Sequence, residues 1–112
     1  MPALPEQLAA DLLVARKARD AAATNALRTT LAAFANAEAP PAPETSSSSP
    51  PITGLVEHER LALDDTDHRR ILREQIAVRV EAAHEYDTIG QAQAATTLRA
   101  EIAALQPYLA GA

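Results

Sequence analysis

The sequence predicts an all-α fold: a small helical bundle of two antiparallel hairpins joined by a disordered loop rich in proline and serine. Apolar residues recur three or four positions apart in four segments, which is the spacing of one helix face. Alanine, the strongest helix former, is abundant, whereas aromatic residues make up only 3% of the chain. Alternation with a period of two, which would indicate strands, is not found. We therefore expect one helical domain spanning residues 1–112.

The first predicted hairpin consists of Pro5–Ala18 and Ala21–Ala37. Pro5 suits the first position of a helix, where its missing N–H costs nothing. Asp20 suits the N-cap of the second helix, because its carboxylate can accept hydrogen bonds from free N–H groups. The short connection between the two segments makes them antiparallel neighbours.

A proline- and serine-rich stretch, residues 39–63, separates the two predicted hairpins. The prolines of its first part, Ala39–Gly54, exclude a helix, and that part has almost nothing to bury. The loop continues loosely through Leu63. We interpret this stretch as a flexible loop within the domain.

The second predicted hairpin consists of about Thr66–Thr88 and Gln91–Gln106, with Gly90 as the residue that ends the first of these helices. The acidic residues before it favour the positive end of a helix dipole. Its apolar stripe is predicted to be Leu72, Ile76, Val80 and Ala83. The core of the whole bundle is predicted to contain Leu8, Leu12, Leu27, Leu31, Phe34, Leu72, Ile76, Leu98, Ile102 and Leu105.

Composition restricts the classes of function. The net charge of −5 argues against a dedicated nucleic-acid binder, which usually carries a basic excess. The chain has no cysteine, so disulfides and cysteine nucleophiles are excluded. No apolar run approaches the length of a membrane span, and the N-terminal residues do not resemble a signal peptide. We expect a cytoplasmic protein with no membrane partner.

The residues predict no catalytic, cofactor or metal site. The densest group of possible ligands is Glu81, His84, Glu85 and Asp87, which we interpret as a solvated acidic helix face rather than a metal site. Asp64 and His68 are more typical of an N-cap with a nearby imidazole than of an acid–base pair.

Basic residues form two groups, Arg16, Lys17, Arg19 and Arg28 around the first turn, and Arg69, Arg70, Arg73 and Arg79 along the third helix. Interspersed acids, such as Glu74 four residues after Arg70, favour salt-bridged, solvated helix faces. A nucleic-acid contact is the alternative interpretation.

Five stretches follow one another along the chain in the order of a known family pattern: DLLVARKARD, ALRTTLAAFANAE, LDDTD, REQIAVRVEAAHEYDTIG and LRAEIAALQPYL. Together they resemble the first helical domain of the YqeY family of GatB/YqeY-like proteins. The polar and aromatic residues that match the family pattern, and that are candidates for partner contact, are Lys17, Asp20, Arg28, Asn36, Glu38, Arg79, Glu85, Tyr86, Glu101 and Tyr108.

The resemblance implies an all-helical domain similar to part of GatB, a subunit of the glutamine-dependent amidotransferase that corrects mischarged tRNA. It thereby implies an association with carbon–nitrogen ligase activity that uses glutamine as the amido-N-donor. The active sites of that complex lie in other domains and subunits, so the implied role is a non-catalytic accessory module, with tRNA or an amidotransferase-like complex as partner. The alternative is a helical scaffold for protein–protein interaction or self-association without a tRNA role.

Overall fold

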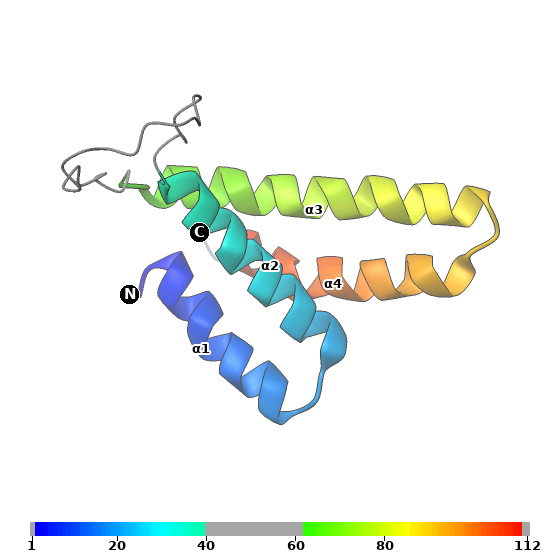
Figure 1. Cartoon of the computed structure of the whole chain (residues 1–112), viewed down its shortest axis with the longest axis horizontal. Coiled ribbons are helices and arrows are strands. Elements are labelled where there is room, and N and C mark those ends of the chain that lie inside the picture. Colours follow the sequence, from blue (N-terminus) through cyan, green and yellow to red (C-terminus); the bar gives the residue numbers. More distant parts are fainter. Residues whose placement is uncertain (1, 40–61, 111–112) are drawn as a thin grey trace, which may run out of the picture.

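The computed structural model of the chain describes residues 2–39 and 62–110. Four α-helices follow one another in this part of the chain: α1 (Leu4–Lys17), α2 (Ala21–Glu38), α3 (Asp65–Thr88) and α4 (Ala92–Ala110). Helices α1 and α2 form one antiparallel hairpin, and α3 and α4 form the other (Figure 1). The predicted all-α bundle of two hairpins is confirmed.

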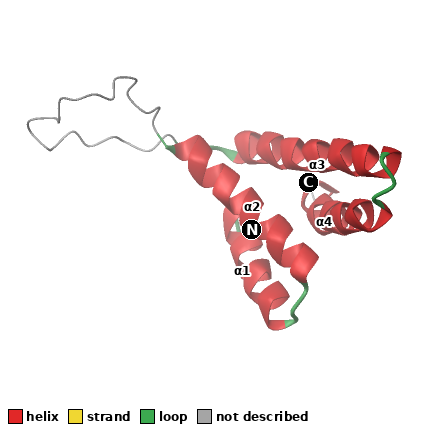
Figure 2. Cartoon of the chain, turned by 45° about the vertical axis from the view of Figure 1, so that its right-hand side comes forward, coloured by secondary structure: helices red, strands yellow, loops and turns green. Residues whose placement is uncertain are grey.

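The two hairpins cross rather than align (Figure 2). Helix α2 is central, because it packs against α1, α4 and α3. Helices α1 and α3 lie at the periphery, each packed chiefly on its hairpin partner. The turn between α1 and α2 consequently projects away from the second hairpin (Figure 1).

The turn of the first hairpin is tight because one residue serves both helices. Helix α1 ends with the backbone N–H of Asp20 donating to the Ala15 carbonyl at 2.9 Å and that of Arg19 donating to the Arg16 carbonyl at 3.1 Å. This is the Schellman arrangement, which requires a left-handed residue after the cap. Arg19 takes that conformation, with φ of 58°. The Asp20 carboxylate then accepts from the Ala23 N–H at 3.1 Å, which confirms it as the N-cap of α2.

The second hairpin begins and turns with equally specific signals. The Asp64 side chain accepts from the Asp67 N–H at 2.9 Å, and the Asp67 side chain accepts from the Asp64 N–H at 3.1 Å. This reciprocal pair is a capping box at the start of α3. Gly90 follows the cap of α3 with φ of 79°, so the predicted glycine stop is confirmed.

Six of the eight predicted helix boundaries differ from the structure, five of them by a single residue. Helix α1 ends at Lys17 rather than at Ala18, α2 ends at Glu38 rather than at Ala37, and α3 begins at Asp65 rather than at Thr66. Helix α1 begins at Leu4 rather than at Pro5, and α4 begins at Ala92 rather than at Gln91. Helix α4 also continues through Pro107 to Ala110 instead of ending at Gln106. The last turn is held from outside, since Arg69 Nη1 donates to the Leu109 carbonyl at 3.4 Å and the Tyr108 hydroxyl donates to Asp11 Oδ2 at 2.5 Å. These bonds offset the intrahelical bond that proline cannot make.

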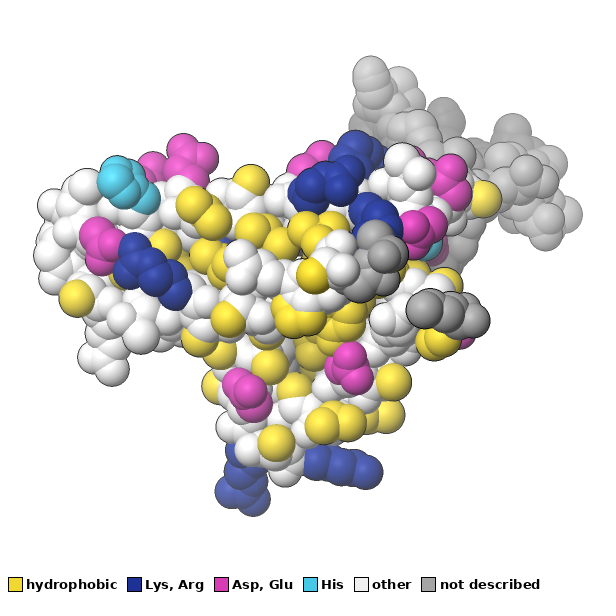
Figure 3. Space-filling view, turned by 180° about the vertical axis from the view of Figure 1, so that it is seen from behind, with side chains coloured by type: hydrophobic (Ala, Val, Ile, Leu, Met, Phe, Trp, Pro, Cys, Tyr) yellow, Lys and Arg dark blue, Asp and Glu magenta, His cyan; other side chains and the backbone are white. Residues whose placement is uncertain are grey.

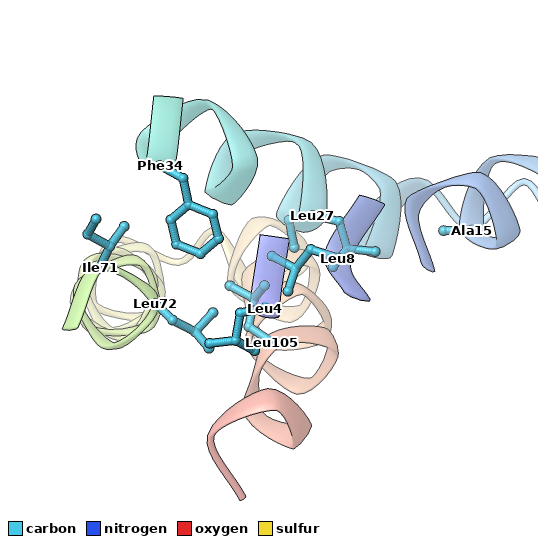
Figure 4. Close-up of a cluster of buried hydrophobic side chains, with 9 residues drawn as sticks. Leu4, Leu8, Ala15, Leu27, Phe34, Ile71, Leu72 and Leu105 are labelled. Atoms are coloured by element: carbon cyan, nitrogen blue, oxygen red, sulfur yellow. The ribbon is translucent and has the colours of Figure 1, made fainter. Parts of the chain in front are cut away.

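The main core lies where the two hairpins cross, and leucines from α1, α2, α3 and α4 form one cluster there together with Phe34 and Ile71 (Figure 4). Six predicted core residues are buried: Leu8, Leu27, Phe34, Leu72, Ile102 and Leu105. The other four are half-buried: Leu12, Leu31, Ile76 and Leu98. Close helix approach is provided by buried small residues, among them Ala15, Ala26, Ala83 and Ala95.

Val80 does not belong to the inner stripe of α3, because its side chain is 52% exposed. The inner position one residue earlier is taken by Arg79, which is buried, and Ile71 is a further core residue that the predicted stripe omits.

The predicted loop, residues 39–63, lies mostly outside the described residues. Of its described members, Ala39 and Ala62 are exposed, and Leu63 packs half-buried against the core. Leu63, the last residue of the predicted loop, therefore contributes to the bundle.

Candidate functional site

A buried polar network crosses the middle of the bundle. Arg79 of α3 and Glu101 of α4 are each only 7% exposed, and Arg79 Nε donates to Glu101 Oε1 at 2.8 Å. Because a buried charge is costly unless it is paired, each of these groups stabilises the other. The interpretation of Arg79 as part of a solvated helix face is therefore wrong.

Neighbouring polar groups complete the hydrogen bonding of the Arg79 guanidinium. Its Nη1 donates to the Gln75 backbone carbonyl at 3.1 Å and to Gln75 Oε1 at 2.9 Å, and its Nη2 donates to Thr29 Oγ1 at 2.5 Å. The Thr29 hydroxyl in turn donates to the Asn25 carbonyl at 2.9 Å.

The second oxygen of Glu101 is satisfied from α2. Asn25 Nδ2 donates to Glu101 Oε2 at 3.1 Å, and Arg28 Nη2 donates to Asn25 Oδ1 at 3.1 Å. The network therefore links α2, α3 and α4 and leaves no charged group of the pair without a partner. We interpret it as the device that fixes the relative position of the two hairpins.

Asn25, Thr29 and Gln75 were not among the predicted site residues. The signal that identifies them is their spacing, since Asn25 and Thr29 are four apart on α2, and Gln75 and Arg79 are four apart on α3. Polar residues at helical spacing beside an apolar stripe share the inner face.

The network brings together three of the residues that carry the family resemblance: Arg28, Arg79 and Glu101. Two others also serve the fold. Asp20 caps α2, and Tyr108 bonds Asp11 of α1. Burial of the Tyr108 ring and the adjacent Asp11 carboxylate raise the pKa of the Tyr108 hydroxyl above its ordinary value, so the phenol stays protonated.

The remaining candidates are spread over the surface. Lys17, Asn36, Glu85 and Tyr86 are exposed on α1, α2 and α3, and Glu38 is half-buried near the end of α2. Lys17 ends α1, Asn36 and Glu38 lie in the last turn of α2, and Glu85 and Tyr86 lie near the end of α3, so these candidates are distributed over three helices.

A basic tip, which we define as Arg16, Lys17 and Arg19, marks the turn of the first hairpin. All three side chains are exposed, and none forms an ion pair within residues 2–39 and 62–110. Figure 3 shows basic side chains extending from this end of the molecule. By contrast, the arginines near the start of α3 are paired, Arg69 with Asp65 at 2.7 Å and Arg70 with Glu74 at 3.1 Å.

A pocket of about 680 Å³ lies between the start of α1, the start of α3 and the last turn of α4. Its wall includes Leu4, Leu63, His68 and Tyr108. His68 is 8% exposed, and its ring lies edge-on to the Phe34 ring at a centroid distance of 4.7 Å. Its Nε2 is buried and has no hydrogen-bond partner among residues 2–39 and 62–110. The imidazole therefore serves as a core ring, and Asp64 caps α3 rather than activating it.

The described residues do not form a metal-binding cluster of histidine, aspartate and glutamate. The acidic group predicted on α3 contains an ion pair instead, because Asp87 bonds Arg99 of α4. The Arg99 hydrogen bond holds the pKa of the Asp87 carboxyl below its ordinary value.

Among the helices of the described chain, none is both long and apolar enough to cross a membrane. The chain matches no family model, no curated protein and no solved structure with which it was compared.

Proposed function

We propose that the chain is a non-catalytic accessory module of a tRNA-dependent amidotransferase-type assembly, as its resemblance to the YqeY family implies. The observation that supports a tRNA contact is the basic tip, where three exposed cations stand together on a chain of net charge −5. Cations that are not already paired can replace the counterions of a phosphate backbone. Arg16, Lys17 and Arg19 are the residues we assign to this contact.

The buried network supports the proposal indirectly. A binding surface is effective when rigid elements hold it. Arg79 and Glu101 fix the crossing of the hairpins, and Asp20 fixes the turn that carries the basic tip. On this proposal, the buried residues of the family pattern maintain the shape of the module, and the exposed ones are available to partners.

The proposal assigns the amide-transfer chemistry to other subunits. Hydrolysis of glutamine needs an activated nucleophile and groups that stabilise an oxyanion. The chain has no cysteine, and each threonine hydroxyl that reaches a hydrogen-bond partner in the described helices donates to a backbone carbonyl. Purified protein incubated with glutamine, ATP, magnesium and mischarged tRNA should release no ammonia. Release that disappears on mutating a residue of this chain would overturn the non-catalytic assignment.

A gel shift with tRNA at physiological salt tests the proposed contact. We expect Lys17→Ala to weaken binding and to reduce the slope of log K against log salt by about one, since one phosphate contact is lost. Arg73→Ala is the matched control, because Arg73 is an exposed cation of α3, away from the tip, that forms no ion pair with any other described residue. An equal effect of both variants, or no shift of tRNA by the parent protein, would contradict the proposal.

Helical scaffolding is the second candidate function, and one observation favours it. Large apolar side chains are exposed on the two peripheral helices, including Leu13 and Val14 on α1 and Val78 on α3. Such side chains gain by burial against another protein.

A further inference from the structure

Two exposed helix faces each combine apolar side chains with charged ones. The charges are positive on the first face and negative on the second. The α1 patch consists of Leu13, Val14, Arg16 and Lys17 near the end of α1. The α3 patch consists of Val78, Glu81 and Glu85 near the end of α3, with Ile89 at its cap.

Each patch is a continuous face rather than a set of scattered residues. Leu13 lies three residues before Arg16 and four before Lys17, and Val78, Glu81, Glu85 and Ile89 follow one another at spacings of three, four and four. Residues at these spacings are neighbours on a helix surface. Both patches face solvent, as Val14 is 65% exposed and Ile89 is 67% exposed.

The charges of the two patches are unsatisfied within the described chain. Arg16 and Lys17 form no ion pair there, and neither do Glu81 and Glu85. The neighbouring acid Glu74 and the neighbouring Asp87 are already paired, with Arg70 and Arg99. The two available acids of the α3 patch thus match the two available cations of the α1 patch in number and sign.

The patches cannot meet within one molecule. The ends of α1 and α3 that carry them belong to different hairpins and point in different directions (Figures 1 and 2). We propose that the α1 patch of one copy docks on the α3 patch of a second copy, with Leu13 and Val14 packed beside Val78 and Ile89 and the cations opposite the two glutamates. Complementary charge selects this pairing over like faces.

This contact does not depend on the proposed tRNA role. It shares Arg16 and Lys17 with the basic tip, however, so self-association and polyanion binding are predicted to compete. Self-association is measured without nucleic acid, which keeps the test of this inference separate from the gel shift.

Sedimentation of the full chain over a concentration series tests the inference. The parent should associate reversibly and dissociate as salt rises, because exposed ion pairs are screened. The α1 reversal, Arg16→Glu with Lys17→Glu, and the α3 reversal, Glu81→Lys with Glu85→Lys, should each weaken association at least about tenfold, since like charges then face one another. Arg73→Glu, on another face of α3, should leave association unchanged.

The decisive measurement is made on a mixture of the α1-reversal and α3-reversal proteins. Together they should associate again, because an intact α1 patch and an intact α3 patch are both present and the reversed patches are complementary as well. Circular dichroism of each variant verifies that the helices are kept. A parent that stays monomeric, a control that weakens association as much as the reversals, or a mixture that fails to recover it would each overturn the inference.

Discussion

Individual residues in this chain are placed by conformation and burial as much as by their chemistry. Arg19 is a clear case, because it adopts a left-handed backbone conformation that costs a side-chain-bearing residue free energy. Its position after the cap of α1 is one that glycine usually fills. The sequence shows no glycine there, so this strain could not be predicted from residue types.

Arg19→Gly should raise the free energy of unfolding by about 0.5–1 kcal/mol, as glycine takes positive φ without a Cβ clash. Urea denaturation provides the measurement. Arg19→Ala is the control, since it removes the charge and keeps the Cβ. An equal gain from alanine would show that charge, not backbone conformation, limits stability at this turn.

His68 is a second residue whose placement costs free energy, in this case because a polar ring atom is buried. Its buried Nε2 has no hydrogen-bond partner in the part of the chain that the structure describes, so the desolvation of that nitrogen is not compensated there. His68→Phe should increase the free energy of unfolding by about 1 kcal/mol, because the edge contact with Phe34 is kept and the adjoining pocket gives room. His68→Gln, which keeps a polar end and loses the ring, should destabilise. A phenylalanine variant that melts below the parent would contradict this account.

At the scale of the helices, the Arg79–Glu101 pair decides how α3 packs on α4 and both on α2. Removing one partner leaves the other charge buried, so Arg79→Met or Glu101→Leu alone should each cost about 3–5 kcal/mol. The double variant should cost less than either single change, because no charge is then stranded. Chemical denaturation of all four proteins gives the coupling energy.

The exposed pair Arg70 and Glu74 is the matched control on α3. The corresponding single changes there should each cost about 0.5 kcal/mol or less, since solvent screens the charges. Similar losses at both pairs would mean that burial does not set the importance of the network.

The start of α3 carries a pH-dependent element. The Asp67 N–H, and further hydrogen bonds of the same turn, hold the pKa of the Asp64 carboxyl below its ordinary value of 3.8. A depressed pKa contributes stability that is complete above the unfolded-state pKa and is lost as pH falls through the folded-state pKa. Asp64→Asn should therefore lose less melting temperature between pH 7 and pH 3 than the parent. An identical acid limb in both proteins would show that this carboxylate is not linked to folding.

The apolar stripe of α3 shows what sequence periodicity can and cannot predict about the buried face of a helix. Going from Leu72 to Val80 advances the helix by about 80° beyond two full turns, whereas Arg79 stays within about 20° of Leu72. The buried position is thus 79, and a search for apolar side chains passes over it because an arginine occupies it. A search for apolar side chains passes over Glu101 in the same way. Its charge predicts a surface residue that contacts a partner, whereas the structure buries it beside Ile102.

At the scale of the whole molecule, helix number, order and pairing followed from periodicity and caps, such as Asp20 and Gly90. The crossing of the hairpins did not, because it depends on contacts between residues as distant as Asn25 and Glu101. The candidate site was predicted only as separate residues, and which of them are buried depends on that crossing. Lys17 is a candidate for partner contact because the structure places it at the projecting turn of the first hairpin, which the sequence alone does not show.

The pocket at the start of α1 also has a topological consequence. Pro2 and Ala3 line it together with Pro107 and Tyr108. The start of α1, the first helix, therefore lies beside the last turns of α4, the last helix. A circular permutant that joins these ends through a short glycine–serine linker and opens the chain between residues 40 and 61 should keep all four helices and both hairpin turns. Its helical signal and melting transition should match the parent's. If it fails to fold, the order in which the hairpins are synthesised, and not only their final contacts, determines the structure.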